Sequence, residues 1–363
     1  MIVSVVYFIL FFTLFMVLLV LLLINRKQYP SSPVELPRIS ILIAARNEEH
    51  TIIRCLTAIE NLDYPKEKIE VLIGNDGSTD RTQEVIEAFI EDKPNYRCIA
   101  ITGTIAQLKG KQNVLAQLSG LATSDYFFYT DADIAVPPTW VKAMLAAMQD
   151  NIGVVTGITT TQDHTLFARL QALDWLYALG LMQVVSDLNL PVTTMGNNML
   201  LRRKAYEDVG GFEKVPFSIT EDIAIFNKIL AKGWGFRNIY SHKVLALSTP
   251  AEGFYQFMHQ RKRWMKGSMH LPVYMVIILV LHSAYYPVLL PFGFYTSAGI
   301  VASIFAAKLS LQSLYLHVCL RRLNRAAPWW LYFLFEIYLV VTSILLLVFY
   351  YLPVKTVWKG RKY

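Results

Sequence analysis

Acidic side chains occur in this chain at points where apolar runs end. Asp131 and Asp133 follow the run Tyr126–Thr130, and Asp76 follows the run Ile69–Gly74. Residues i and i+2 share one side of an extended chain, so Asp131 and Asp133 can act together. Carboxylate oxygens are preferred ligands of Mg²⁺ and similar cations, which stabilise the negative charge on a departing diphosphate. An isolated Asp-x-Asp is most often a solvated turn, but the preceding strand and the other motifs favour a metal site.

Two further motifs lie closer to the C-terminus. Glu221 and Asp222 begin a predicted helix, where the helix dipole favours acids and where a carboxylate could also take a proton from a hydroxyl. Gln260, Arg263 and Trp264 follow in a Gln-x-x-Arg-Trp pattern. The guanidinium can bind a diphosphate through paired hydrogen bonds, and the indole offers a face on which a sugar or lipid packs. The alternative for this pattern is an aromatic and basic anchor at a membrane interface.

The elements that must position these groups alternate along the chain. Five apolar runs rich in Ile and Val predict strands: Ile39–Ala44, Ile69–Gly74, Tyr96–Ile101, Tyr126–Thr130 and Gly153–Thr156. The stretches between them predict helices: Glu48–Leu62, Asp80–Glu91, Lys111–Leu121 and Thr139–Met148. Strands that are apolar on both faces and separated by helices indicate an α/β fold, with an open, mostly parallel sheet covered on both faces. Such a sheet binds ligands at the carboxyl ends of its strands, where the acidic motifs fall.

Four more elements follow in the sequence. The apolar spacing of Leu166–Val185 predicts a helix that lies along the catalytic region or the membrane surface. Gly196–Phe212 has a strand-turn-helix pattern, and Thr220–Lys232 predicts a second clear helix. Gly253–His270 is amphipathic, with aromatic residues among basic ones, and predicts a helix in the membrane interface.

The composition indicates a membrane protein. Hydrophobic residues make up 54% of the 363 residues and charged residues only 17%, which is too apolar for an ordinary soluble domain. Met1–Ile24 is an uncharged apolar run long enough to cross a bilayer. It has no basic residue before it and no small-x-small cleavage site after it, so we interpret it as an uncleaved anchor and not as a signal peptide. Arg26 and Lys27 follow directly, which predicts that the rest of the chain is delivered to the cytoplasm.

Three further spans are predicted at Pro272–Pro291, Phe292–Leu320 and Trp329–Leu352. The predicted order is an anchor, a Pro-rich linker, a catalytic domain, an interfacial helix, these spans and a basic tail, at residues 1–25, 26–37, 38–252, 253–270, 271–352 and 353–363. With three spans the basic tail falls outside the cytoplasm, against the positive-inside rule, whereas two or four spans would bring it inside. Lys308 within a span is costly unless it snorkels or faces protein.

Cysteine usage and charge exclude other classes of protein. Cys55, Cys98 and Cys319 are widely spaced and fit no metal-ligand pattern, so we expect reduced, structural thiols. The net charge of +7 is spread over the chain, with clusters at 321–325 and 355–362 beside apolar stretches. These clusters favour anionic lipid headgroups, and not nucleic acid, as the partner.

The ordered motifs resemble the membrane-bound branch of the family 2 glycosyltransferases. The resemblance implies a GT-A fold and transfer of a sugar from a nucleotide-diphosphate donor, with inversion at the anomeric carbon. It implies that Ala45, Glu48 and Asp76 line the base and ribose of the donor. Lys111 resembles a basic residue near the nucleotide, although a solvated lysine at a helix start is almost as well supported. Asp131 is implied as a ribose or diphosphate contact.

The resemblance also implies the residues of the transfer itself. Asp133, together with Asp131, is implied as the ligand of Mg²⁺ or Mn²⁺. Asp222 is implied as the base that takes the proton of the acceptor hydroxyl, with Glu221 beside it as the second catalytic acid. The segment Gly196–Met199 matches one that lies against the donor sugar and the acceptor.

The Gln-x-x-Arg-Trp match implies contacts with both substrates. Arg263 is implied to face the pyrophosphate and Trp264 the acceptor, with Gln260 beside them. Processive polysaccharide synthases share this pattern, so it does not distinguish a single transfer from repeated ones.

The resemblance, from Pro37 to Gly267, is more specific for the reaction than for the substrates. We expect a UDP-hexose donor and a lipid acceptor, because the membrane part is small and the chain's end resembles the tail of ceramide-glucosyltransferase-like enzymes. The first alternative is a processive synthase, whose channel needs more than about four helices unless the protein dimerises or has a partner. The second is an inactive homologue that serves as an assembly subunit, yet Asp76, Asp133 and Asp222 are all present. We expect a multi-pass protein of the cell membrane with a cytoplasmic catalytic domain, and a homo-oligomer is one arrangement open to it.

Overall fold

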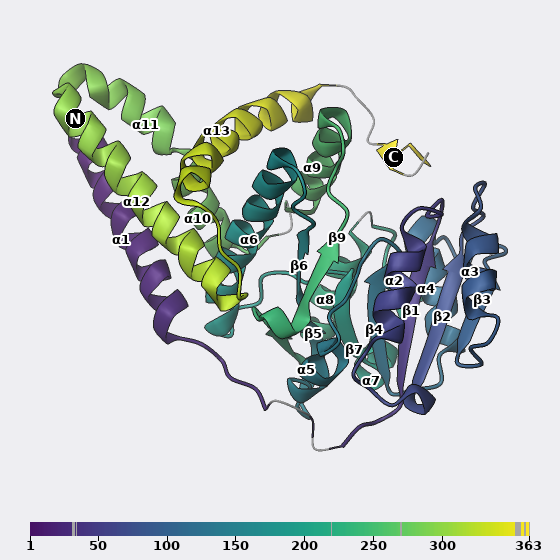
Figure 1. Cartoon of the computed structure of the whole chain (residues 1–363). Coiled ribbons are helices and arrows are strands. Elements are labelled where there is room, and N and C mark those ends of the chain that lie inside the picture. Colours follow the sequence, from purple (N-terminus) through teal and green to yellow (C-terminus); the bar gives the residue numbers. More distant parts are fainter. Residues whose placement is uncertain are drawn as a thin grey trace.

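The computed structural model describes the chain except residues 31–32, 34, 219, 269–270, 353–356, 359–360 and 363. Its centre is a sheet of seven strands in the order β3-β2-β1-β4-β7-β5-β8 (Figure 1). Two small sheets pair β6 with β9 and β10 with β11. The strands are β1 (Ile39–Ala45), β2 (Ile69–Asn75), β3 (Tyr96–Ala100), β4 (Tyr126–Asp131), β5 (Ile152–Thr156), β6 (Ile158–Thr161), β7 (Asn198–Arg202), β8 (Gly235–Asn238), β9 (Leu245–Ser248), β10 (Val357–Trp358) and β11 (Arg361–Lys362).

Helices cover both faces of the large sheet. Ile41 of β1 belongs to one hydrophobic core together with Ile52 of α2, whereas Leu42 belongs to a second core together with Val114 of α4. Successive side chains of a strand point to opposite faces, so β1 is buried on both, as the apolar runs predicted. The helices of this region are α2 (Ile52–Glu60), α3 (Thr82–Ile90), α4 (Gly110–Leu121), α5 (Trp140–Ala146), α6 (Leu166–Asp187), α7 (Arg203–Asp208), α8 (Glu221–Ala231) and α9 (Phe254–Ser268).

The predicted fold class is confirmed, with differences at the short elements. All five predicted strands are present, and the sheet is mostly parallel, but β7 runs antiparallel to both β4 and β5. In the seven-stranded sheet and the β6–β9 pair, three strands were not predicted: β6, β8 and β9. Each has four residues, which is too short for an alternating pattern to stand out from its surroundings.

Four helical segments in the described part of the chain are long and apolar enough to cross a membrane: Ile2–Ile24, Val273–Tyr295, Ala298–Arg322 and Trp329–Tyr351. They are α1, then α10 (Val273–Ser283) continued through α11 (Tyr285–Phe292), then α12 and α13. In Figure 1, α1, α11 and α12 lie at the left, away from the sheet. Helix α6 packs against α1, α12 and α13, against β6 of a small sheet and against β8 of the large one, so it joins the sheets to the candidate membrane helices. The predicted tail, 353–363, lies mostly outside the described residues.

A buried ion pair explains how α12 accommodates Lys308. Its ammonium lies against Glu336 Oε2 of α13, and Gln312 Nε2 donates to the same oxygen at 2.7 Å. The side chains of Lys308 and Glu336 are only 4% and 3% exposed. Charged groups in membrane segments are tolerated where they face protein and have a partner. Of the two alternatives predicted for Lys308, snorkelling or facing protein, the second is the one found.

We expect Lys308→Met to destabilise the protein more than the double variant Lys308→Met/Glu336→Leu. The single change leaves Glu336 as an uncompensated buried charge, which costs about 3–5 kcal/mol, whereas the double change removes the charge with its partner. Thermal unfolding in detergent measures both variants under the same conditions. A double variant no more stable than the single one would show that the charge of Glu336 is not the cause.

Candidate active site

Neighbouring strand ends bring the acidic motifs to one edge of the sheet. In the parallel register, Ala44 of β1 pairs with Asp131 of β4, and Ala45 pairs with Asn75 of β2. Asp76 follows Asn75 directly. The rule that ligands bind at the carboxyl ends of parallel strands therefore applies to this edge.

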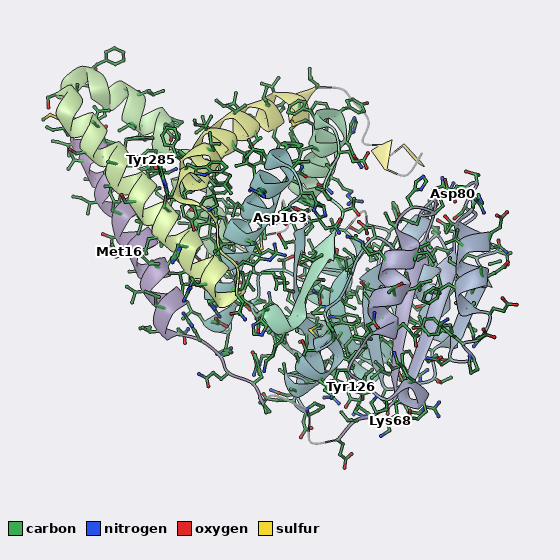
Figure 2. All side chains as sticks on the ribbon, viewed as in Figure 1. Met16, Lys68, Asp80, Tyr126, Asp163 and Tyr285 are labelled. Carbon is green, nitrogen blue, oxygen red and sulfur yellow. The ribbon has the colours of Figure 1, made fainter. Side chains whose placement is uncertain are left out.

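A cavity of about 920 Å³ lies at this edge. In Figure 2, Asp80 lies at the carboxyl-end edge of the sheet, whereas Lys68 and Tyr126 lie near strand starts at the opposite edge. The residues that the motifs predicted for donor, metal, base and acceptor contacts all line the cavity: Ala45, Glu48, Asp76, Lys111, Asp131, Asp133, Glu221, Asp222, Gln260, Arg263 and Trp264. The fold thus brings together four motifs that are far apart in the sequence.

Hydrogen bonds between the loops after β1 and β2 hold Glu48 and Asp76 in place. The amide of Glu48 donates to Thr82 Oγ1 at 2.7 Å, and Thr51 Oγ1 donates to Glu48 Oε2 at 2.7 Å. The guanidinium of Arg46 donates to the backbone carbonyl of Asp76. The two loops therefore form one connected wall of the cavity.

Lys111 connects two of the predicted acids. Its ammonium forms ion pairs with Asp131 Oδ1 and, at 3.4 Å, with Glu221 Oε1. Burial opposes the charge on Lys111, but the two carboxylates outweigh it and raise the pKa of the ammonium. Burial also raises the pKa of Glu221, against the effect of Lys111. The side chain of Lys111 is 15% exposed, so it is a fixed cation of the cavity and not the solvated lysine of the alternative prediction.

Asp131 and Asp133 have the chemistry of a partial metal site. Asp133 Oδ2 accepts a hydrogen bond of 2.9 Å from Ser248 Oγ of β9, while burial and the neighbouring Asp131 raise the pKa of Asp133. Among the described residues, no group of three or more His, Cys, Asp or Glu could hold a metal ion. Mg²⁺ is usually bound through one or two carboxylates plus substrate phosphates and water. The two aspartates fit that type of site, in which a diphosphate supplies further ligands.

Asp222 has a fixed orientation at the start of α8. Its Oδ2 accepts a hydrogen bond of 2.7 Å from the amide of Gly196, and its Oδ1 accepts one of 2.9 Å from the amide of Ile223. A Cβ atom on Gly196 would lie 2.8 Å from Asp222 Cβ, so a larger residue would displace the carboxylate. Each carboxylate oxygen can accept a second bond, so the group remains able to take a proton from a hydroxyl.

The segment Gly196–Met199 lines the cavity only in part. Its first two residues do so, whereas Asn198 and Met199 are 0% and 1% exposed. The Asn198 amide donates to the carbonyl of Val244 at 2.9 Å and accepts from Trp140 Nε1 at 2.8 Å. The expectation that the whole segment faces the substrates is wrong for these last two residues, which hold β7 in the core.

Helices α9 and α6 form the wall opposite the sheet. Gln260, Arg263 and Trp264 line it from α9, and the ring of Trp175 of α6 meets Trp264 edge to face, with 4.6 Å between ring centres. Further lining residues of α6 are apolar: Ala178, Leu179 and Met182. The cavity therefore has an acidic side at the sheet and an apolar side at α6.

Two of the cavity's side chains had no predictive signal in the sequence. Ser248 lies in the unpredicted strand β9, and its contact with Asp133 depends on the pairing of β9 with β6. Trp175 lies in an amphipathic helix, where a single aromatic residue is indistinguishable from a packing residue.

The chain is similar to known glycosyltransferases. The model of Glycosyl transferase family 21 matches residues 4–363. The probable glycosyltransferase YdaM of Bacillus subtilis is 26% identical over 256 residues, 68% of this chain and 59% of that protein. A poly-beta-1,6-N-acetyl-D-glucosamine synthase of Staphylococcus aureus is 30% identical over 237 residues, 64% of this chain and 55% of that protein. The chain thus spans less than two thirds of the length of these relatives.

One solved structure is similar over most of its length. A mannosyltransferase from Pyrobaculum calidifontis, in complex with GDP-Man and Mn²⁺, has a TM-score of 0.57 and 18% identity, and the match covers 89% of this chain and 96% of that one. At this identity the likeness shows the fold, which is the GT-A type of mostly parallel sheet with helices on both faces.

Proposed function

Because this chain belongs to glycosyl transferase family 21, we propose that it transfers a sugar from a nucleotide-diphosphate donor to a lipid acceptor. The donor is expected to be a UDP-hexose, and the product a glycolipid that receives one sugar. The reaction takes place in the cavity at the carboxyl ends of β1, β2 and β4.

The composition of the cavity wall is the observation that supports a lipid acceptor. Asp222 lines the same cavity as the apolar residues Leu179 and Met182 of α6. Helix α6 in turn packs against α1, α12 and α13, three of the segments that could cross a membrane. A lipid whose chains lie along α6 would present its hydroxyl to Asp222 without leaving the membrane interface.

Each charged group has a separate task in this proposal. Asp222 takes the proton of the acceptor hydroxyl while the oxygen of that hydroxyl forms the bond to the anomeric carbon. The bond from that carbon to the diphosphate breaks, the nucleoside diphosphate leaves, and a single displacement inverts the configuration. Lys111, held by Glu221, and Arg263 supply positive charge beside the leaving diphosphate.

Asp131 and Asp133 are proposed to hold Mg²⁺ or Mn²⁺. The cation would neutralise charge on the leaving diphosphate. The fold neighbour from Pyrobaculum calidifontis was solved with GDP-Man and Mn²⁺, which supports a divalent cation in this type of fold.

The second candidate function is processive synthesis of a polysaccharide. It is favoured by the relatives that are named poly-beta-1,6-N-acetyl-D-glucosamine synthase, at 28% and 30% identity. Extrusion of a polymer needs a channel, and the four candidate spans of the described residues are few for one unless the chain forms an oligomer or has a partner. We therefore place this function second.

A transfer assay tests the first function. Purified protein is incubated with a native lipid extract, Mg²⁺ or Mn²⁺ and labelled UDP- or GDP-hexoses, and the label is extracted into the organic phase. We expect label from a UDP-hexose in that phase only when the cation is present. Label from a GDP-hexose alone would correct the donor, and label in neither lipid nor polymer would contradict the enzymatic function.

We also propose that the cavity is cytoplasmic and that α13 does not cross the membrane. Arg325, just before α13, lies 3.8 Å from Asp163, which precedes α6. At the other end of α13, Lys262 of α9 donates to the carbonyls of Phe349 and Leu352 at 3.1 and 2.9 Å. A crossing helix would take its ends to opposite sides of a hydrocarbon core about 30 Å thick. With one end against Asp163 of the catalytic region and the other against Lys262 of α9, α13 lies along the interface, and the basic tail stays inside as the positive-inside rule requires.

Reporter fusions in a bacterial host measure this topology. We expect green fluorescent protein fused after Tyr363 to fluoresce and alkaline phosphatase at the same place to be inactive, because each reporter works on one side of the membrane. The matched control is fusion after Thr296, between α11 and α12, where the opposite pattern is expected. Active phosphatase after Tyr363 would instead make α13 a crossing helix.

A further inference from the structure

Arg261 lies inside the Gln-x-x-Arg-Trp pattern at a position to which the pattern gives no role. Its side chain is 14% exposed, and its Nη2 lies 2.6 Å from Asp174 Oδ2 of α6. Tyr338 of α13 donates its hydroxyl to the same oxygen at 3.4 Å. Asp174 is therefore the point at which α6, α9 and α13 are joined.

Arg261 in turn contacts the indole of Trp264. The two residues are three apart on α9 and so share a helix face, and the guanidinium carbon lies 4.7 Å from the centre of the indole ring. Trp175, the neighbour of Asp174 in the chain, meets the same indole at 4.6 Å. Arg261, which pairs with Asp174, and Trp175, which follows Asp174 in the chain, therefore both contact the Trp264 indole.

Some of these residues line the cavity and can contact a substrate, whereas Asp174 does not line it. Trp264, Arg261 and Trp175 line the cavity, whereas Asp174 is not among the described residues that do. Asp174 therefore acts on a substrate only through its neighbours.

We propose that Asp174 is a positioning residue for the acceptor, acting through Arg261 to keep the Trp264 indole in place as a binding platform. This inference rests on the proposed function, in which Trp264 faces the acceptor. Without the ion pair, the guanidinium leaves the indole, and the indole can occupy further rotamers. Because the acceptor binds only one of these rotamers, its affinity falls. Apart from Arg263, the groups proposed to hold the donor lie on the sheet side of the cavity, so donor binding is expected to be unaffected.

The test compares three variants of the full-length protein in detergent with native lipids. Asp174→Asn removes the charge that holds the guanidinium. Arg261→Lys keeps an ion pair but loses the planar group that lies on the indole. Lys262→Met is the matched control, because Lys262 ties the same helix to α13 but does not line the cavity among the described residues.

We expect Asp174→Asn and Arg261→Lys each to raise the KM for the acceptor about tenfold, the scale of a desolvated cation–π contact. The KM for the donor and metal-dependent donor hydrolysis stay unchanged in both, and Lys262→Met keeps the wild-type acceptor KM. If Asp174→Asn fails to fold, because its arginine becomes an unpaired buried charge, Arg261→Lys carries the test alone. The same rise in Lys262→Met would overturn the proposal, since it would show a general loosening of α9.

A fluorescence measurement separates this proposal from the proposed function. The signal of Trp264 is the difference between each variant and the same variant carrying Trp264→Phe. We expect its anisotropy to fall in Asp174→Asn and Arg261→Lys but not in Lys262→Met. A fall without transfer to any acceptor would uphold the positioning role and refute the function. Unchanged anisotropy in both variants would overturn the positioning role, whatever the activity.

Discussion

Asp222→Asn lowers kcat for sugar transfer by about 10²- to 10⁴-fold in this account, the usual contribution of a general base, and leaves the donor Kd unchanged. The amide has nearly the shape of the carboxylate but cannot take the proton of the acceptor hydroxyl. In the wild type, the two oxygens of the Asp222 carboxylate accept bonds from the backbone amides of Gly196 and Ile223, so the carboxylate is already oriented. Transfer kinetics and calorimetric donor titration measure the two quantities.

Two further variants make this result specific. Gly196→Ala keeps Asp222 but places a Cβ 2.8 Å from the Cβ of that aspartate, so kcat should fall while the donor Kd stays constant. Glu221→Gln should instead weaken donor binding, because Glu221 pairs at 3.4 Å with Lys111, the cation proposed to lie beside the diphosphate. Loss of donor binding in Asp222→Asn would move Asp222 into the donor site and refute its role as base.

Asp133→Ala should abolish the increase in donor affinity that Mn²⁺ or Mg²⁺ brings, a loss of at least about tenfold at saturating metal. Asp133 is half-buried beside Asp131 and accepts a hydrogen bond from Ser248 of β9; the donor diphosphate would complete the coordination of a cation held by the two carboxylates. Donor titrations with and without the cation measure this effect independently of turnover.

Ser248→Ala is the matched control for Asp133→Ala. Ser248 donates to Asp133 Oδ2 at 2.9 Å and so orients a proposed ligand without replacing it. We expect a smaller loss of metal-dependent affinity, about tenfold or less. A metal titration like that of the wild type in Asp133→Ala would exclude Asp133 as the ligand.

The acidic edge of the cavity could be predicted because it depends on local patterns. Apolar runs locate the strands, parallel strands share a carboxyl-end edge, and Asp76, Asp131 and Asp133 follow such runs. The proposed base and the α9 residues came from the resemblance in motif order, since a helix-start acid and a basic, aromatic helix have common structural explanations. Each of these motifs spans few residues and lies on a single element or at its end, so the sequence alone can reveal it.

Contacts between distant elements could not be predicted. The contact of Ser248 with Asp133 depends on a four-residue strand, and that of Asp174 with Arg261 on the packing of two helices. Helical spacing tells which face is buried but not which partner covers it. The proposed orientation of α13 could not be predicted for a similar reason. Apolar composition indicates contact with lipid, but not whether a helix crosses the bilayer or lies along it.

The size of the product tests the central claim most directly, which is that the cavity makes a glycolipid by a single transfer. The purified protein is supplied with its donor, the divalent cation and a lipid extract, and the products are followed over time by mass spectrometry. This account predicts a lipid that carries one added hexose at every time point and no product from Asp222→Asn. Chains that lengthen with time would contradict the single transfer and establish the protein as a polysaccharide synthase.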